Sequence, residues 1–272
     1  MRDKNLEDFS RWIRNKGLNP KIPLEVDKLK NLSVLDLTKY KLRELPESIC
    51  HLPNLTVLKL SGNRLTKLPK NIGNLKKLKN LQCENNLLDE LPKSIGELDS
   101  LVILNLNGNR LTKLPDEFYK LTKLTRLTIA ANYLTSLSEK LKNLKNLLYF
   151  SLDTNNLSEL PEAFEDMSSL YYLDLSYNNF TKLPESISKI KELETLLLEG
   201  NEITDLPSLE SHDMLIKLNL NDNNLCKIDF DISKLEDLQL LSFDNNNLEH
   251  LPDAICKLDK LNCLSVSANS LK

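Results

Sequence analysis

Leucine and asparagine recur along this chain at a nearly constant spacing. In the stretch LNLNGNRLTKLPDEFYKLTKL, which runs from Leu104 to Leu124, leucines alternate with polar residues up to Asn109 and return after it. Alternation with period two is typical of a half-buried β-strand. Asn109 lies where the pattern calls for a buried residue, so the chain buries an amide among its leucines.

The same unit recurs eleven times. Steps of 23 residues, with one step of 22, connect a tyrosine and ten asparagines: Tyr40, Asn63, Asn86, Asn109, Asn132, Asn155, Asn178, Asn201, Asn223, Asn246 and Asn269. Each unit reads LxxLxLxxNxL, and most continue with LPxxIxxL, as in Leu183-Pro184-Ile187-Ile190. One unit alone cannot bury its leucines, but stacked units bury them against one another. The proline that follows most of the strands forbids strand continuation and favours an extended, polyproline-like return.

This pattern resembles the leucine-rich repeat superfamily, in its 23-residue class, over about residues 24–272. The resemblance implies an α/β-type solenoid, a horseshoe with eleven parallel strands on its concave face. Its convex side would consist of short irregular, 3-10 or polyproline-like segments. We expect residues 24–272 to form this solenoid of about eleven repeats, and residues 1–23 to form an N-terminal helical cap.

The recurring asparagine has a structural explanation. A solenoid must turn after each strand, and the turn leaves buried backbone N–H and C=O groups that need partners. An asparagine side chain carries both a donor and an acceptor. We therefore expect the asparagines to form a ladder between stacked turns, and we expect Asn109→Leu to unfold the middle of the stack.

The two ends of the predicted solenoid need cover. Leu6, Phe9 and Ile13 lie on one face of a helix predicted over residues 5–16, with Asn5 as its N-cap and Gly17 as its stop. This helix is interpreted as a cap over the first coil; a helix that binds a partner or a membrane surface is the alternative. No cap follows Asn269, so either the chain is cut from a longer protein or its last strand is covered by self-association.

Three units depart from the pattern. Ser138 and Asp229 stand where other units have proline. The unit after Asn201 is one residue short, and either His212 or Met214 falls near its buried leucine position. A local kink is one interpretation of these departures, and a binding loop is the other.

Composition narrows the class of partner and compartment. The net charge is −3 and the sequence pI is about 5.8, which argues against nucleic acid or an anionic membrane surface as the partner. No apolar run is long enough to span a membrane. The five cysteines form no CxxC pair, and Cys83 occupies a leucine position as a small buried hydrophobe. These features and the N-terminus, which lacks an apolar signal segment, favour a reducing, cytoplasmic location.

Catalytic motifs are sparse. The three histidines fall in different units without metal-ligand spacing, and the six glycines form no phosphate-binding loop. The sequence therefore predicts a non-enzymatic protein without a cofactor or a metal.

Candidate binding residues come from the variable positions three, five, seven and eight of LxxLxLxxN, which point out of the sheet. Tyr149 and Tyr172 fall on adjacent strands, and tyrosine and arginine are the residues that anchor protein interfaces. From Asp153 to Asp244 these positions carry five acids and only one base, Lys217, so a partner with a basic, partly apolar patch would suit this half of the face. The alternative is an ordinary solvated surface. The predicted partner-binding residues are Arg126, Tyr133, Tyr149, Asp153, Tyr172, Asp174, Tyr177 and Glu199.

The predicted function is therefore a non-catalytic protein–protein interaction module. Analogy with the family suggests a bacterial effector or a signalling adaptor, whose partner is a small GTPase or a host signalling protein. An effector would be delivered into the host cytoplasm. Two alternatives remain open: a targeting domain of a larger enzyme, such as a ubiquitin ligase, and a self-assembling scaffold.

Overall fold

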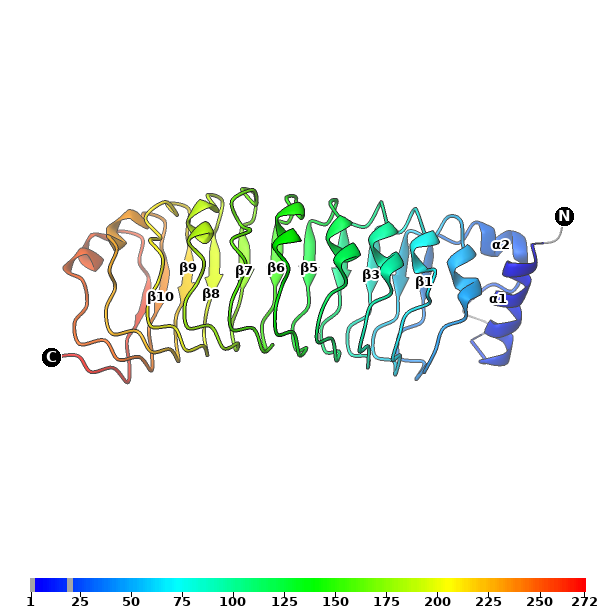
Figure 1. The fold of residues 1–272 in the computed structure, drawn as a ribbon, viewed down its shortest axis with the longest axis horizontal. Helices are drawn as coiled ribbons and strands as arrows, with labels where there is room; N and C mark the ends of the chain where they lie inside the picture. Colours follow the sequence, from blue (N-terminus) through cyan, green and yellow to red (C-terminus); the bar gives the residue numbers. More distant parts are fainter. Residues whose placement is uncertain (1–2, 19–21) are drawn as a thin grey trace. The chain divides into compact units, whose positions relative to one another are not determined.

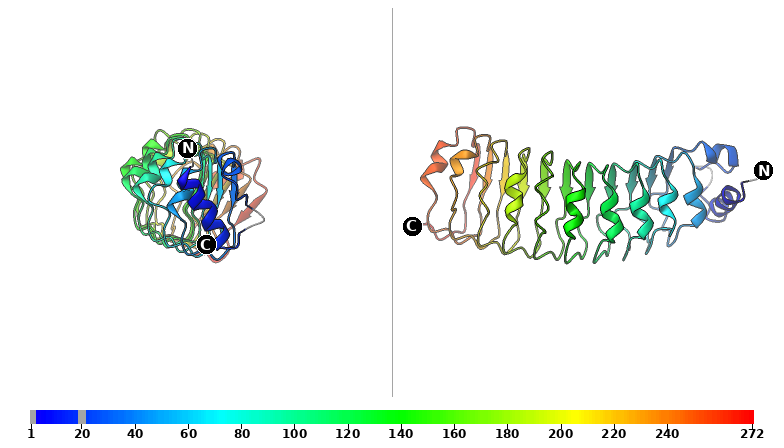
Figure 2. Two further views of the ribbon diagram at one scale, coloured as in Figure 1. Left: turned by 90° about the vertical axis from the view of Figure 1, so that its right-hand side faces the viewer. Right: turned by 45° about the horizontal axis from the view of Figure 1, so that its top comes forward.

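The computed structural model describes residues 3–18 and 22–272. The chain forms two compact units, which we call the N-terminal unit (up to Leu124) and the C-terminal unit (from Thr125). In each unit, parallel strands form one layer and short 3-10 helices lie on the other side of the core (Figures 1 and 2). The described residues contain eleven parallel strands and an N-terminal helix, which confirms the predicted fold class.

The N-terminal unit begins with two helices, α1 (Lys4–Asn15) and α2 (Val26–Lys30). Its four strands pair in the order β1-β2-β3-β4, and their bounds are β1 (Val34–Asp36), β2 (Val57–Lys59), β3 (Asn80–Gln82) and β4 (Ile103–Asn105). The 3-10 helices of this unit are η1 (Glu47–His51), η2 (Ile72–Asn74), η3 (Lys93–Glu97) and η4 (Asp116–Lys120).

The C-terminal unit contains seven strands, each hydrogen-bonded to the next along the chain. They are β5 (Arg126–Thr128), β6 (Tyr149–Ser151), β7 (Tyr172–Asp174), β8 (Thr195–Leu197), β9 (Lys217–Asn219), β10 (Leu240–Ser242) and β11 (Cys263–Ser265). Its 3-10 helices are η5 (Glu139–Asn143), η6 (Glu185–Lys189), η7 (Ile232–Lys234) and η8 (Asp253–Lys257).

Strand register follows from the constant repeat length. Because each step along the chain returns the same repeat position, Val34 pairs with Val57, and Tyr149 pairs with Tyr172. In β2 the central residue, Leu58, faces the core at 0% exposure, while its two neighbours on the strand are half-buried and point to the other side. Variable positions of successive repeats therefore form rows across the strands of each unit.

The return segments begin with an extended, polyproline-like backbone, as the sequence predicts. Pro46 is extended, with φ −75° and ψ 145°, and the chain then turns into η1 and buries Ile49. Ser138 replaces proline before η5, and its Oγ instead accepts a hydrogen bond from Lys140 N at 3.2 Å. The short unit contains turns rather than a 3-10 helix between residues 203 and 215. There His212 fills the leucine position at 0% exposure, whereas Met214 is exposed.

The asparagines form a ladder between consecutive coils. Asn109 Oδ1 accepts a hydrogen bond from Leu88 N at 3.0 Å, and its Nδ2 donates to Cys83 O at 3.0 Å and to Leu106 O at 2.9 Å. Two of these three partners belong to the preceding coil. This direction explains the exception at the first repeat, because Tyr40 has no preceding repeat to bond. The first turn is instead served by Asn63, which bonds Leu37 O and Leu42 N.

The cap prediction is confirmed for the helix and wrong for its N-cap. Leu6, Phe9 and Ile13 are fully buried on one face of α1, which packs against η1 and α2. The N-cap is Asp3, whose Oδ1 accepts from Leu6 N at 3.3 Å, and not Asn5, which lies inside the helix. Aspartate is as good an N-cap as asparagine, so the earlier acceptor sets the start. Gly17 stops the helix with φ +66°.

The leucines of the last two strands, β10 and β11, differ in their exposure to solvent. Leu264 on β11 is 40% exposed, whereas its register partner Leu241 on β10 is 1% exposed. No helix within residues 3–18 and 22–272 combines the length and the apolar character needed to cross a membrane.

Candidate functional site

Arg126, Tyr149 and Tyr172 form a continuous stack on the solvent side of the C-terminal unit. The two tyrosine rings lie 4.0 Å apart between centroids and 6° from parallel, and the Arg126 guanidinium carbon lies 3.7 Å from the centre of the Tyr149 ring. These three residues occupy the same repeat position on β5, β6 and β7 (green in Figure 1). Parallel register therefore places the side chains directly beside one another, and their packing fixes the rings before any partner arrives.

Tyr177 lies in the turn after β7 and is held by two separate contacts. Its hydroxyl donates a short hydrogen bond to Glu199 Oε1, and this bond raises the pKa of Tyr177 to about 12. Its backbone has φ +52°, a conformation that is uncommon for a bulky residue and that costs on the order of 1–3 kcal/mol. The turn therefore presents a fixed aromatic side chain, which is 52% exposed.

Gly200 is a supporting residue that the motif search missed. A Cβ at Gly200 would lie 2.5 Å from Cδ1 of Tyr177, so only glycine lets the ring lie against this backbone. The sequence gives only a weak signal for this role of Gly200. Position eight adopts a positive φ in every repeat, whether or not the residue is glycine: Lys39, Gly62, Asn85, Gly108, Ala131, Thr154, Tyr177, Gly200, Asp222, Asn245 and Ala268.

The carboxylates of Asp153 and Asp174 lie beside the stack. Asp174 Oδ1 accepts from Ser176 N at 3.1 Å and its Oδ2 accepts from Tyr172 Oη at 3.3 Å. Burial raises the pKa of Asp174 above its ordinary value, against the hydrogen bonds from Ser176, and the charge of Asp153 adds to the rise. Burial is also the main cause that raises the pKa of Tyr172. Two acids therefore lie next to the half-buried aromatic rings of the stack.

The other acidic residues of this face differ in the hydrogen bonds that they accept. Glu199 accepts from Tyr177 and also from Asn219 Nδ2, at 2.8 Å. Asp244 is held by Ser265 Oγ and by Ser267 N, so its oxygens already serve the backbone and side chains of β11 and its following turn. Among the described residues of the C-terminal unit, no lysine or arginine forms an ion pair with any of Asp153, Asp174, Glu199, Asp222 and Asp244.

Tyr133 is the predicted tyrosine that has no ring or hydrogen-bond contact with the other predicted residues among the described residues. It follows Asn132 in the turn after β5 and is 56% exposed. The remaining predicted residues lie on or directly after four consecutive strands, β5 to β8. We call Arg126, Tyr149, Tyr172 and Tyr177 the tyrosine surface.

Two exposed apolar side chains extend this surface. Leu148 and Tyr171 occupy position two of consecutive repeats and are each 38% exposed. They are in register, because Tyr171 N donates to Leu148 O at 3.0 Å. Position two is polar in most repeats, so a contiguous aromatic and aliphatic patch at this place is a property of these two units.

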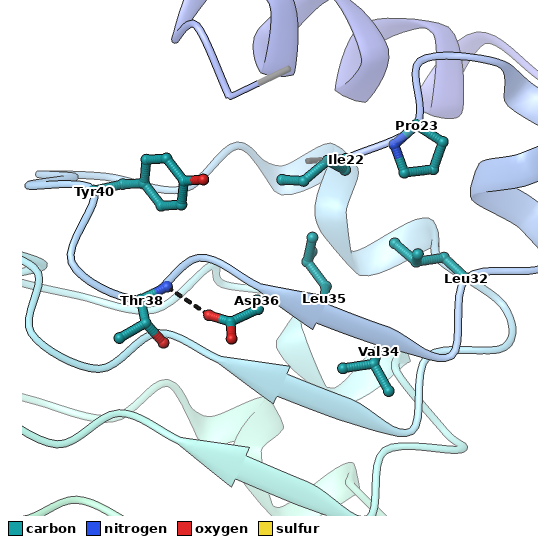
Figure 3. A pocket seen from close by; sticks show the side chains of 8 residues that line it. All are labelled: Ile22, Pro23, Leu32, Val34, Leu35, Asp36, Thr38 and Tyr40. Atoms are coloured by element: carbon teal, nitrogen blue, oxygen red, sulfur yellow. Dashed lines mark hydrogen bonds between the residues drawn. The ribbon is translucent and has the colours of Figure 1, made fainter. Parts of the chain in front are cut away.

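Two hollows lie in the N-terminal unit, which contains none of the predicted binding residues. The first, about 340 Å³, lies between the segment after α1 and β1, where Ile22 and Val34 line it and Asp36 Oδ1 accepts from Thr38 N at 2.9 Å (Figure 3). The second, about 620 Å³, lies among the return segments around Leu68 and Pro69. Within the described residues, no three histidine, cysteine or acidic side chains lie together as metal ligands would.

Three family models match this chain. The model for a leucine-rich repeat region matches residues 11–87, a leucine-rich repeat model matches residues 76–134, 122–180 and 160–203, and another matches residues 237–258. None of these models describes an enzyme. A comparison with curated protein sequences gives no match.

Solved structures give the most informative matches. A leucine-rich repeat protein from Leptospira interrogans is 33% identical, with a TM-score of 0.84, over 91% of this chain and 69% of that one. The ectodomain of the Arabidopsis thaliana receptor kinase GASSHO1/SCHENGEN3 is 28% identical, with a TM-score of 0.72, over 83% of this chain and 31% of that one. An internalin from Listeria monocytogenes, at 20% identity and a TM-score of 0.57 over 94% of each chain, shares the fold. With its asparagine ladder and eleven parallel strands, this chain belongs to the leucine-rich repeat superfamily.

Proposed function

We propose that this chain is a non-catalytic module that binds a protein partner on the sheet face of its C-terminal unit. The observation that carries the proposal is the stack of Arg126, Tyr149 and Tyr172. Tyrosine and arginine dominate binding energy at interfaces, and side chains that are already fixed lose little entropy when a partner binds. The exposed Leu148 and Tyr171 add apolar area next to the stack.

The comparisons support a binding role in general terms. The GASSHO1/SCHENGEN3 ectodomain was solved in complex with CASPARIAN STRIP INTEGRITY FACTOR 2, so a related repeat array of that length binds a partner. This chain spans about a third of that ectodomain. An effector or signalling-adaptor role, a cytoplasmic location and a small GTPase or host signalling protein as partner are the finer forms of this proposal. A targeting role within a larger enzyme is compatible with the same surface.

The test is the variant that carries both Tyr149→Ala and Tyr172→Ala. Affinity capture from lysate, followed by mass spectrometry, identifies proteins bound by the wild-type chain. We expect these proteins to be lost with the double variant, while circular dichroism and the melting transition show an intact fold. Retention of every captured protein by a folded double variant would remove this site.

A second candidate function, self-assembly, rests on the exposed edge of β11. Leu264 is 40% exposed where its equivalents in inner strands are buried, and β11 pairs with β10 alone among the described residues. Unpaired strand edges invite pairing. Light scattering over a range of concentrations tests this proposal. If the chain self-assembles, the average molecular mass should rise with protein concentration, and the variant Leu264→Glu should reduce that rise.

A further inference from the structure

Among the described residues, the stack of Arg126, Tyr149 and Tyr172 has a cation at one end, where Arg126 lies on Tyr149. Arg126 covers the outer face of the Tyr149 ring, and Tyr149 covers one face of the Tyr172 ring. The other face of Tyr172 is directed toward β8, because rings stacked along the register line present their faces to neighbouring strands. Its register partner there is Thr195, a short residue that is itself half-exposed. A phenol ring extends well beyond a threonine side chain, so Thr195 does not cover the outer part of this face.

The surroundings of this face are acidic and partly apolar. Asp174 bonds the Tyr172 hydroxyl, and the charges of Asp174, Glu199 and Asp222 all act on the nearby hydroxyl of Tyr177. Leu197, the register partner of Asp174 on β8, is half-buried and contributes apolar surface on the same side of the sheet. Lys217 on β9 is the register partner of Thr195, and it is the one base among the outward-facing positions from Asp153 to Asp244. The balance of charge therefore favours a cation with an aliphatic stem.

A second register row, of polar side chains, runs across the same strands beside the stack. Thr128, on β5, is 6% exposed, and its Oγ1 has no hydrogen-bond partner among the described residues. Thr128, Ser151 and Asp174 are register partners on β5, β6 and β7, so their side chains point to the same side of the sheet. Thr128 and Ser151 are buried, so a chain segment that crosses the strands along this row meets the half-buried Asp174 and can place a side chain against Tyr172.

Resting on the proposed function, we propose that the partner inserts an arginine against the face of Tyr172 that is directed toward β8. The guanidinium would stack on the ring as Arg126 stacks on Tyr149, and its N–H groups would donate to the carboxylates of Asp174 and Glu199. A planar, forked cation meets both demands, whereas the compact ammonium of lysine meets them less well. The stack would then be capped by a cation at both ends.

Peptide selection tests this proposal. A phage-displayed library of random peptides is panned against the wild-type chain, and the peptides that depend on Tyr149 and Tyr172 are identified with the double alanine variant. We expect these peptides to share an arginine. Replacing it with lysine is expected to weaken binding by about tenfold, as measured by fluorescence anisotropy.

Charge variants provide the controls. Asp174→Asn is expected to weaken binding of the arginine-containing peptide, and Lys217→Gln is expected to strengthen that binding. Asp36→Asn is the matched control, because Asp36 on β1 accepts from Thr38 N as Asp174 accepts from Ser176 N, with distances of 2.9 and 3.1 Å. We expect Asp36→Asn to leave binding unchanged.

The outcomes separate the two proposals. Tyrosine-dependent peptides without arginine, or an arginine that lysine replaces without loss, would overturn the arginine assignment and leave the tyrosine surface in place. If panning yields no peptide, or only peptides that the double alanine variant binds equally well, the tyrosine surface itself fails and the arginine assignment fails with it.

Discussion

The Tyr177 ring lies against the backbone of Gly200, so closely that a Cβ at Gly200 would be 2.5 Å from Cδ1 of the ring. We therefore expect Gly200→Ala to displace Tyr177 from Glu199 and to weaken binding at the tyrosine surface. Gly62→Ala is the matched control. Gly62 has nearly the same backbone angle, φ +68° against +67°, but a Cβ there meets only the flexible side chain of Lys39.

Both glycine variants pay a backbone cost of about 1 kcal/mol for alanine at positive φ. Equilibrium unfolding should show similar losses of stability for the two, whereas binding of a tyrosine-dependent peptide should fall only for Gly200→Ala. Equal binding by both variants would show that Gly200 does not position the tyrosine.

The asparagine ladder shares its acceptors, and this limits the effect of removing one member. Asn223 Oδ1 is the acceptor for Ile203 N, at 3.0 Å, and its Nδ2 donates to Leu198 O and Leu220 O. Leu198 O also accepts from Asn201, and Leu220 O also accepts from Asn246. Replacing Asn223 with leucine therefore leaves one buried N–H without its partner while both carbonyls keep one donor.

We expect Asn223→Leu to lower the free energy of unfolding by about 2 kcal/mol, the cost of a buried donor left unsatisfied. The neighbouring Asn224 is exposed, so Asn224→Leu should change stability by less than about 0.5 kcal/mol. Urea denaturation of both variants measures the difference. Equal stability of the two would contradict the ladder. By the same reasoning, Asn109→Leu should destabilise its coil rather than unfold the whole stack.

Periodicity was enough to predict the strands, the ladder and the rows, because a fixed repeat length forces each position into register with its equivalents. The stacking of Tyr149 on Tyr172 followed from that register. The contact of Tyr177 with Gly200 could not be predicted, since it depends on a positive φ and on the absence of one Cβ. The N-cap was also misplaced, because Asp3 and Asn5 both have suitable side chains and only the geometry decides between them.

The different roles of the acidic residues also could not be predicted from the sequence. The sequence placed Asp174 and Asp244 at variable positions five and seven of one acidic face, and charge alone could not separate them. The structure shows that Asp244 is bonded to the hydroxyl of Ser265 and the amide of Ser267, whereas Asp174 lies beside an aromatic ring with a raised pKa. The distinction arises from which neighbours donate hydrogen bonds: those of Asp244 belong to the next repeat, whereas those of Asp174 belong to its own.

His212 predicts a stability that depends on pH. Its ring is buried in a leucine position, with Nδ1 3.1 Å from Leu209 O and Nε2 3.1 Å from Ile187 O. Burial lowers the pKa of His212, outweighing these carbonyls and the charge of Asp213, which act in the opposite direction. The folded state then binds fewer protons than the unfolded state, so stability should fall as pH drops below the unfolded pKa of about 6.5.

The variant His212→Leu restores the residue that other repeats use, and both carbonyls keep their backbone donors, His212 N to Leu209 O and Ile190 N to Ile187 O. We expect the difference in unfolding free energy between this variant and the wild type to grow from about pH 7.5 to about pH 5. Urea titrations at a series of pH values provide the measurement. A difference that stays constant with pH would show that His212 keeps the same protonation state on unfolding.

Asp174 predicts a conflict between stability and binding. Because burial raises its pKa in the folded state, the folded chain binds more protons than the unfolded chain in the acidic range, and the associated stability is present below the unfolded pKa and lost as pH rises through the folded pKa. At neutral pH the ionised Asp174 is thus unfavourable to folding. Asp174→Asn keeps an acceptor for Ser176 N and removes the charge, so we expect it to raise the melting temperature at neutral pH.

The same variant should weaken binding of a cationic peptide, because the carboxylate that destabilises the fold is the one that would meet the partner's charge. A gain of stability together with a loss of affinity is the signature of a residue kept for function. Thermal unfolding at neutral and acidic pH tests the first half, and the stabilising effect should disappear in acid, where the wild-type carboxyl is protonated. A stabilising effect that persists in acid would assign it to packing instead, and lower stability at neutral pH would mean that Asp174 serves the fold.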